Sequence, residues 1–133
     1  MITELTITTR EGCELLDITG KVEQVVREKG LQSGLVVVYS PHTTAGITIN
    51  ENADPAVVED IIMKLSRVID REDPAYRHGE GNSDSHIKTS LVGPSQTVIV
   101  EGGKLLLGTW QGIFFVESDG PRSRKVFVKA VHG

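Results

Sequence analysis

The sequence has a single cysteine and no run of basic residues, and these two absences exclude several classes of protein. Cys13 has no partner with which to form a disulfide within the chain. The densest basic group consists of Arg122, Arg124 and Lys125, and the formal net charge is −4. Because proteins that bind nucleic acid usually carry a larger basic patch, we do not expect a nucleic-acid partner. The lone thiol fits a reducing compartment.

Long hydrophobic segments are also missing. The longest unbroken apolar run, Leu35–Tyr39, is far shorter than the roughly 20 residues that cross a bilayer, so we expect no membrane partner. The N-terminal sequence M-I-T-E lacks the basic start of a signal peptide. We therefore expect a soluble, cytoplasmic protein. With 133 residues, no internal repeat and no low-complexity linker, the chain is expected to form one domain over residues 1–133.

Apolar patterns predict a mostly β protein with two main helices. The second helix has the clearest signal: Asp54 at the N-cap and Pro55 at the first position precede apolar residues at helical spacing up to Ile69. We interpret that apolar stripe as part of the core. Thr19 is predicted to cap the first helix, which ends at Gly30. Strands are predicted at residues 3–9, 13–18, 34–40, 45–50, 97–101, 104–107, 113–118 and 125–131.

The order of these elements predicts the fold class. The first two strands are expected to form a hairpin around Gly12, and another hairpin is expected at Gly102-Gly103. The β-branched run at 34–40 is expected to be a buried strand, residues 71–85 a loop, and 86–92 a single short helical turn. Because strands and helices do not alternate regularly, the sequence predicts an α+β fold, a β-sandwich of mostly antiparallel strands.

The segment Arg77–His86, R-H-G-E-G-N-S-D-S-H, is too polar and glycine-rich to form a core. It contributes His78 and His86, and a third histidine, His42, follows an apolar strand. Neutral imidazoles bind zinc and similar ions, and catalytic sites keep one position open for water or substrate. One interpretation is a divalent-metal site, Zn²⁺ or Mg²⁺, in which Asp84 orients a histidine or binds the ion. The alternative is a set of exposed loop histidines, because His42 is distant from the others in the chain.

A second set of residues could hold a phosphate. Thr43 and Thr44 supply hydroxyl groups just after a strand. Lys88 and Ser90 lie in the predicted helical turn, whose free amide groups also favour an anion. Arg122 adds a guanidinium group. The competing interpretation is ordinary helix capping together with solvated charge.

Three carboxylates are candidates for proton transfer: Asp84, Glu80 and Glu51. Cys13 has no basic or histidine neighbour in the sequence, so a nucleophilic role is not predicted. Trp110, in the turn G-T-W-Q-G, is expected to fill the core or a subunit contact. The glutamine that follows it is either part of the turn or a hydrogen-bonding group at the site.

Three stretches of the chain resemble the YjbQ family: H-T-T-A-G-I-T-I-N-E-N-A-D-P at 42–55, H-G-E-G-N-S-D-S-H-I-K-T-S-L-V-G at 78–93 and G-K-L-L-L-G-T-W-Q-G-I-F-F-V-E at 103–117. The likeness runs in order from His42 to Arg124 and extends more loosely to both ends. It implies a compact, β-rich α+β subunit, a homotrimer with polar sites near subunit boundaries, and an activity described as secondary thiamine-phosphate synthase. It also places all three histidines inside family motifs, which favours the metal interpretation.

Three functions follow from the residues and the resemblance. In the first, an enzyme joins a pyrimidine diphosphate to a thiazole phosphate and releases diphosphate. The histidines would hold the metal, Lys88 and Arg122 the phosphate, and Asp84 or Glu51 would move protons. The second is a metal-dependent hydrolase that uses the same histidines. The third is a non-catalytic trimer that binds a small molecule or a metal. The thiamine-type activity is ranked first because of the resemblance.

Overall fold

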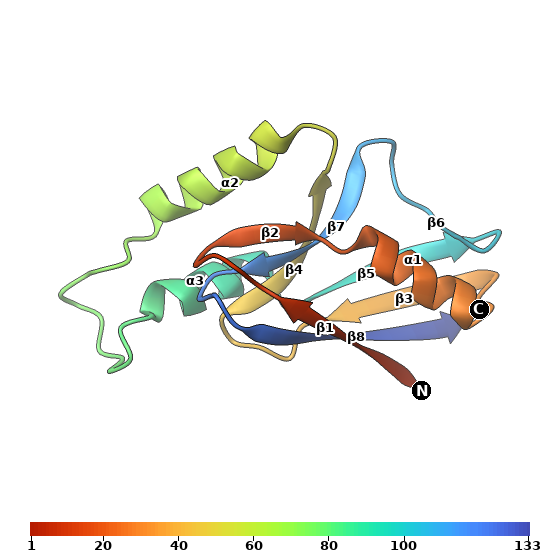
Figure 1. The fold of residues 1–133 in the computed structure, drawn as a ribbon, viewed down its shortest axis with the longest axis horizontal. Coiled ribbons are helices and arrows are strands. Elements are labelled where there is room, and N and C mark those ends of the chain that lie inside the picture. The colour runs from red at the N-terminus through yellow and green to blue at the C-terminus, as the bar shows by residue number, and fades with distance from the viewer.

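Two antiparallel sheets form the frame of the protein, which a computed structural model describes over residues 1–133 (Figure 1). The five-stranded sheet has the order β1-β8-β3-β5-β6 and the three-stranded sheet the order β2-β7-β4. The strands are β1 (Ile2–Thr8), β2 (Glu14–Asp17), β3 (Ser33–Tyr39), β4 (Ala45–Glu51), β5 (Ser95–Glu101), β6 (Lys104–Leu105), β7 (Gln111–Glu117) and β8 (Ser123–His132). The helices are α1 (Thr19–Glu28), α2 (Pro55–Val68) and α3 (Ser83–Val92). None of the three is long and apolar enough to cross a membrane.

The core lies between the two sheets and is completed by α1. Strands of both sheets send alternate side chains inward, as the period of two along a strand requires. Helix α1 adds the side chains spaced three and four residues apart on one face. The predicted α+β fold is confirmed. Fully buried residues of this core include Val22, Val25, Val26, Val36, Val38, Ile47, Val100, Ile113, Phe115, Val126 and Val128.

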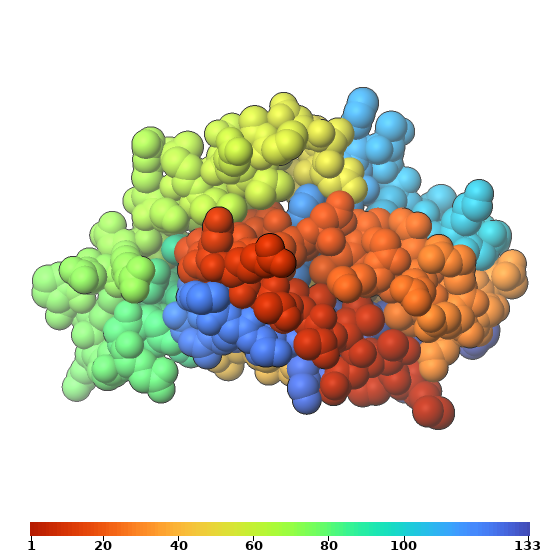
Figure 2. All heavy atoms as spheres, in the orientation of Figure 1, coloured from red at the N-terminus to blue at the C-terminus, as the bar shows by residue number.

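Helix α2 has the predicted bounds, but its apolar stripe is not part of the core. Asp54 caps the helix, accepting a hydrogen bond from the amide of Ala56 at 2.9 Å, and Pro55 is the first helical residue. No residue within α2 is fully buried: the stripe residues Val58, Ile61, Ile62 and Leu65 are half-buried, and only Ile69, just past the end of the helix, is buried. The helix runs along one edge of the molecule (Figures 1 and 2). A helix at an edge has only part of its apolar face covered, which is why the sequence periodicity overstated its burial.

The first predicted hairpin is wrong. β1 pairs with β8 in the five-stranded sheet, and β2 pairs with β7 in the three-stranded sheet. The segment around Gly12 therefore carries the chain from one sheet to the other. The second hairpin is confirmed: Gly102 and Gly103 both have positive φ angles, 59° and 75°, as a tight two-residue turn between β5 and β6 requires.

Two further predictions need correction. Thr19 is not the cap of α1 but its first residue, and its hydroxyl and amide both donate to Asp17 Oδ1. Strand β3 is buried on only one face: Val36 and Val38 are inaccessible, whereas Tyr39 is 44% exposed. No element covers the outer face of the five-stranded sheet, so a continuous apolar run does not make a strand buried on both sides.

Helix α3 begins at Ser83, three residues before the predicted helical turn. Its C-terminal end packs against β4, where the amide of Ile47 donates to the carbonyl of Gly93 at 3.1 Å. Gly46 makes this approach sterically feasible, because a Cβ atom on Gly46 would lie 2.4 Å from that carbonyl oxygen. This contact fixes α3, whose buried polar side lines the candidate site.

Candidate functional site

Helix α3 buries its polar side and exposes its apolar side. Ile87 is 39% and Leu91 66% exposed. A surface helix ordinarily turns its apolar side chains toward the core, so the reversed pattern is not explained by packing. The buried residues are Asp84, Ser85, Lys88 and Thr89.

The buried polar side of α3 faces a cavity of about 290 Å³. The other walls are the segment after β1, the connection between β7 and β8, the C-terminal end of α2 with the residues that follow it, and the segment just before α3. In Figure 2 this connection, in blue, lies between the red segment after β1 and the green segment of α3. The side chains around the cavity are mostly polar. They include Cys13, Arg71, Glu80, Asn82, Asp84, Lys88, Ser118 and Asp119.

Lys88 is the most unusual group in the cavity wall. Its side chain is only 5% exposed, and its Nζ lies 3.5 Å from Asp84 Oδ2. The one hydrogen-bond acceptor of this ammonium group is the sulfur of Cys13, at 3.8 Å. An ammonium group has three donors, so a buried lysine with so few acceptors can still donate to a ligand. Burying a charge is costly unless it is paired and hydrogen-bonded.

The β7–β8 wall is held by a separate set of hydrogen bonds. Asp119 Oδ2 accepts from Asn82 Nδ2 and from an Arg122 guanidinium nitrogen, each at 2.8 Å. The hydroxyl of Ser85 donates to the carbonyl of Ser118 at 2.5 Å. These contacts connect α3 directly to the loop, so the cavity has a defined shape.

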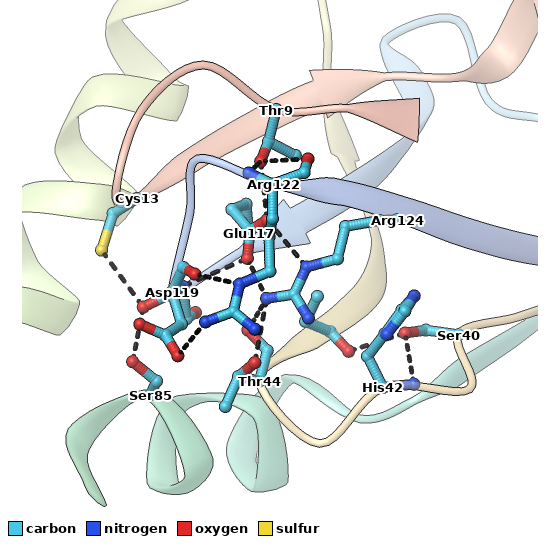
Figure 3. Close-up of polar contacts among 12 residues, drawn as sticks. Thr9, Cys13, Ser40, His42, Thr44, Ser85, Glu117, Asp119, Arg122 and Arg124 are labelled. Carbon is cyan, nitrogen blue, oxygen red and sulfur yellow. Dashed lines mark hydrogen bonds and ion pairs between the residues drawn. The ribbon is translucent and has the colours of Figure 1, made fainter. Parts of the chain in front are cut away.

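Behind this wall lies a buried ion pair between Glu117 and Arg124 (Figure 3). Arg124 Nε donates to Glu117 Oε1 at 2.8 Å, and a second guanidinium nitrogen contacts Glu117 Oε2 and the hydroxyl of Thr44. Thr9 Oγ1 also donates to Glu117 Oε1, at 2.8 Å. Burial alone would raise the pKa of Glu117, but the hydrogen bonds from Arg124 and Thr9 outweigh it and lower that pKa below 4.5.

The carboxylate of Glu117 also contacts the backbone of the β7–β8 connection, which forms the cavity wall. Glu117 Oε2 accepts a hydrogen bond from the amide of Asp119 at 3.1 Å. The ion pair therefore joins the ends of four strands and anchors the loop that lines the cavity.

His42 lies on the other side of this ion pair from Cys13 (Figure 3). Its Nε2 accepts a hydrogen bond from the amide of Lys125 at 2.9 Å, so that nitrogen is not free to bind a metal ion. Burial and the charge of Arg124 lower the pKa of His42 below 6.5, which keeps the imidazole neutral.

His78 and His86 do come together, with ring centroids 5.3 Å apart, beside a separate surface hollow. No group of three His, Cys, Asp or Glu side chains within the chain could hold a metal ion. The predicted three-histidine site therefore does not form within one subunit.

The remaining predicted site residues divide between the cavity and other places. Lys88, Asp84 and Glu80 line the cavity. Glu51 lies at one end of β4, where it pairs with Gln111. Ala45, at the other end, pairs with Glu117, so Glu51 lies about 20 Å along the strand from the cavity end.

The predicted phosphate ligands other than Lys88 lie outside the cavity. Thr43 is exposed beside His42, and Thr44 is buried against Arg124. The hydroxyl of Ser90 donates to the carbonyl of His86 within α3. Arg122 reaches the cavity only through Asp119. Of the five predicted phosphate ligands, Lys88 alone lines the cavity.

Four cavity residues carry no signal in the sequence: Cys13, Arg71, Asn82 and Asp119. They come from different segments, and the packing of α3 against the β7–β8 connection and the end of α2 brings them together. Trp110 is 62% exposed, so it does not fill the core of the subunit. The glutamine after it closes the turn, because Gln111 Oε1 accepts from the amide of Gly108 at 2.8 Å.

Comparison with known proteins gives a consistent assignment. The family model described as "UPF0047 protein YjbQ-like" matches residues 3–133. UPF0047 protein YugU of Bacillus subtilis is 52% identical over 129 residues, which cover 97% of this chain and 98% of the relative. UPF0047 protein MJ1081 of Methanocaldococcus jannaschii is 54% identical over 131 residues, covering 98% and 94% of the two chains.

Solved structures agree with this result. A crystal structure of an uncharacterised YjbQ/UPF0047 protein from Clostridium acetobutylicum has a TM-score of 0.95 and 54% identity, covering 97% of this chain and 99% of the other. A protein of unknown function from Sulfolobus solfataricus also has a TM-score of 0.95, at 32% identity, with 100% and 97% coverage. None of these descriptions states an activity, so the site itself must suggest the chemistry.

Proposed function

The chain belongs to the YjbQ-like UPF0047 family, and we propose that it is an enzyme that acts on a small phosphorylated metabolite in the cavity beside α3. The observation that carries this proposal is Lys88, a buried ammonium group with one sulfur acceptor and one nearby carboxylate. Its remaining donors suit the oxygens of a phosphate. Charge-assisted hydrogen bonds of this kind are roughly twice as strong as neutral ones.

The charges around the cavity support an anionic ligand together with proton transfer. Arg71 and Lys88 are opposed by Glu80 and Asp84, while Asp119 is already paired with a guanidinium group. A phosphate at Lys88 would draw that lysine away from Asp84. It would also favour a proton on the carboxyl groups near it, because like charges repel. Asp84 and Glu80, which also line the cavity, would accept or donate a proton during turnover.

The specific reaction that we propose is thiamine-phosphate synthesis. A C–N bond forms between the thiazole nitrogen and the methylene carbon of the pyrimidine, and the bond from that carbon to the diphosphate oxygen breaks. The leaving diphosphate takes the bonding electrons, and Lys88 would stabilise the negative charge that develops on it. Since one subunit does not provide a fitting metal site, no step of this proposal uses a metal.

We also propose that the protein works as a homotrimer in the cytoplasm. Exposed apolar side chains on the outer face of the five-stranded sheet would be covered by neighbouring copies of the chain. The single free cysteine fits a reducing compartment. These exposed residues include Ile2, Leu35, Tyr39, Ile99 and Val131. Light scattering coupled to size-exclusion chromatography tests the trimer, and Ile99→Lys should shift it toward monomer.

The activity is tested with protein purified without a histidine tag. The two thiamine precursors are supplied with and without Mg²⁺, and thiamine phosphate is measured by mass spectrometry. Lys88→Met should abolish product formation and weaken binding of inorganic diphosphate in calorimetry. Lys64→Met, an exposed lysine on α2, is the matched control and should behave like the parent.

Two results would contradict the proposal. If Lys88→Met binds diphosphate as well as the parent protein does, the cavity is not the anion site. If neither the thiamine precursors nor a panel of phosphoesters is converted, the protein is not an enzyme of this class. Release of phosphate from the phosphoesters without thiamine phosphate formation would instead favour a hydrolase.

A further inference from the structure

The sulfur of Cys13 lies in the wall of the cavity, in contact with the buried ammonium group of Lys88. We propose that Cys13 is a site of oxidation by peroxides, that Lys88 activates it, and that the oxidised form prevents anions from binding in the cavity. The modification itself depends only on the cysteine–lysine contact. Its effect on ligand binding rests on the proposed function.

The geometry provides both requirements for a reactive thiol. The first is a positive charge: Lys88 Nζ is 3.8 Å from Cys13 Sγ, and the side chain of Lys88 is 5% exposed, so water screens it little. A nearby cation stabilises the thiolate, which is the nucleophilic form. The second is access, since Cys13 is only half-buried and lines the open cavity.

Other charged groups face the same space and set the size of this effect. Asp84 Oδ2 lies 3.5 Å from the ammonium group and competes with the sulfur for its charge. Arg71 and Glu80, of opposite sign, also line the cavity. The Cys13 thiol also donates to the carbonyl of Ser118 at 3.9 Å, and this contact favours the protonated form. Lys88 stabilises the thiolate and Asp84 opposes it, which predicts opposite effects for Lys88→Met and Asp84→Asn.

The chemical step is a displacement on a peroxide. The Cys13 thiolate attacks one oxygen of hydrogen peroxide, an S–O bond forms, and the O–O bond breaks. Hydroxide leaves and takes the proton of the newly formed sulfenic acid, which gives water and a sulfenate. The sulfur is oxidised by two electrons and the peroxide is reduced. The product, a sulfenate, is an anion that can accept hydrogen bonds from Lys88, and it would occupy the donors that a phosphate needs.

The test measures modification directly by mass spectrometry. The protein is treated with hydrogen peroxide and dimedone, which traps sulfenic acids, and the adduct on Cys13 is followed with time. Lys88→Met should slow trapping at least about fivefold, and Asp84→Asn should accelerate it about twofold or more. Lys21→Met, an exposed lysine on α1, should match the parent, and Cys13→Ser should form no adduct. Circular dichroism verifies that each variant is folded.

Inorganic diphosphate provides the link to the cavity. If it binds at Lys88, it should slow dimedone trapping, and prior oxidation should weaken its binding in calorimetry. The activation is refuted if Lys88→Met and Asp84→Asn both react at the parental rate, or if Cys13 forms no adduct. If Cys13 reacts as predicted while diphosphate neither protects it nor loses affinity, the effect on ligand binding is refuted and the activation stands. If the parent protein makes no thiamine phosphate while Cys13 reacts as predicted, only the proposed reaction is refuted.

Discussion

Replacing Arg124 with methionine should destabilise the protein by about 3–5 kcal/mol, because it leaves the carboxylate of Glu117 buried without its cation. The side chain of Glu117 is 0% exposed, so water cannot replace the guanidinium group. In the variant only the hydroxyl of Thr9 and the amide of Asp119 still donate to the carboxylate. A protein of this size is typically stable by about 5–15 kcal/mol, so the expected loss is a large fraction of the total.

The measurement is equilibrium unfolding in urea at pH 7, followed by circular dichroism. Arg122→Met is the matched control, because Arg122 also pairs with an aspartate but its side chain is 50% exposed. An exposed pair of this kind contributes about 0–1 kcal/mol. The double variant Glu117→Gln/Arg124→Met removes both charges and should recover much of the stability lost in Arg124→Met.

The pH dependence gives an independent check on the same pair. Folding lowers the pKa of Glu117, so this carboxylate stabilises the folded protein. Its contribution to the free energy of unfolding is fully present above pH 4.5 and is lost as the pH falls toward the pKa of the folded state. This part of the acid sensitivity should be absent in the double variant. If Arg124→Met costs no more than Arg122→Met, or if the double variant is less stable than Arg124→Met alone, the inferred energetics of the pair are wrong.

Three further changes test other parts of the structure. Gly46→Ala should cost about 1–3 kcal/mol in urea unfolding, because its Cβ would meet the Gly93 carbonyl at 2.4 Å; Gly20→Ala, with no atom within 4 Å, should be neutral or stabilising. Folding lowers the pKa of His42, so the unfolding free energy should fall as the pH drops below 6.5. His42→Gln should flatten this dependence on pH, and equal slopes in the parent and the variant would contradict a neutral imidazole in the folded protein. Asp54→Ala should cost about 1 kcal/mol through loss of the α2 cap, compared with Asp60→Ala in the same thermal unfolding assay.

Local signals predicted the elements whose structure depends on neighbouring residues. Asp54 and Pro55 marked the start of α2 correctly, because a cap and a first-turn proline act within one helical turn. Gly102-Gly103 marked the β5–β6 turn, because that turn demands positive φ angles. The predicted β1–β2 hairpin failed because a short glycine-containing connection does not specify whether two strands share a sheet. The α2 stripe failed because periodicity identifies an apolar face without showing what covers it.

The site was predicted only where its residues are close in the sequence. Glu80, Asp84 and Lys88 lie within nine positions of one another, and the structure places all three at one cavity. His42, remote along the chain, was grouped with His78 and His86 by residue type alone, and the structure separates it from them. A nucleophilic role for Cys13 was not predicted, because no basic residue or histidine lies next to it in the sequence. In the structure its sulfur contacts the ammonium group of Lys88.

The sequence by itself determined the fold class, the start of α2, the β5–β6 turn and the family, because each of these depends on local chemistry or on motifs read in order. Only the tertiary structure decided which polar residues share a cavity and which apolar faces remain exposed. The physical reason is that these groups meet across the chain: Lys88 contacts Cys13 from 75 positions away, and Thr9 contacts Glu117 from 108 positions away. Such contacts depend on how two sheets and a helix pack, and no local pattern specifies that packing.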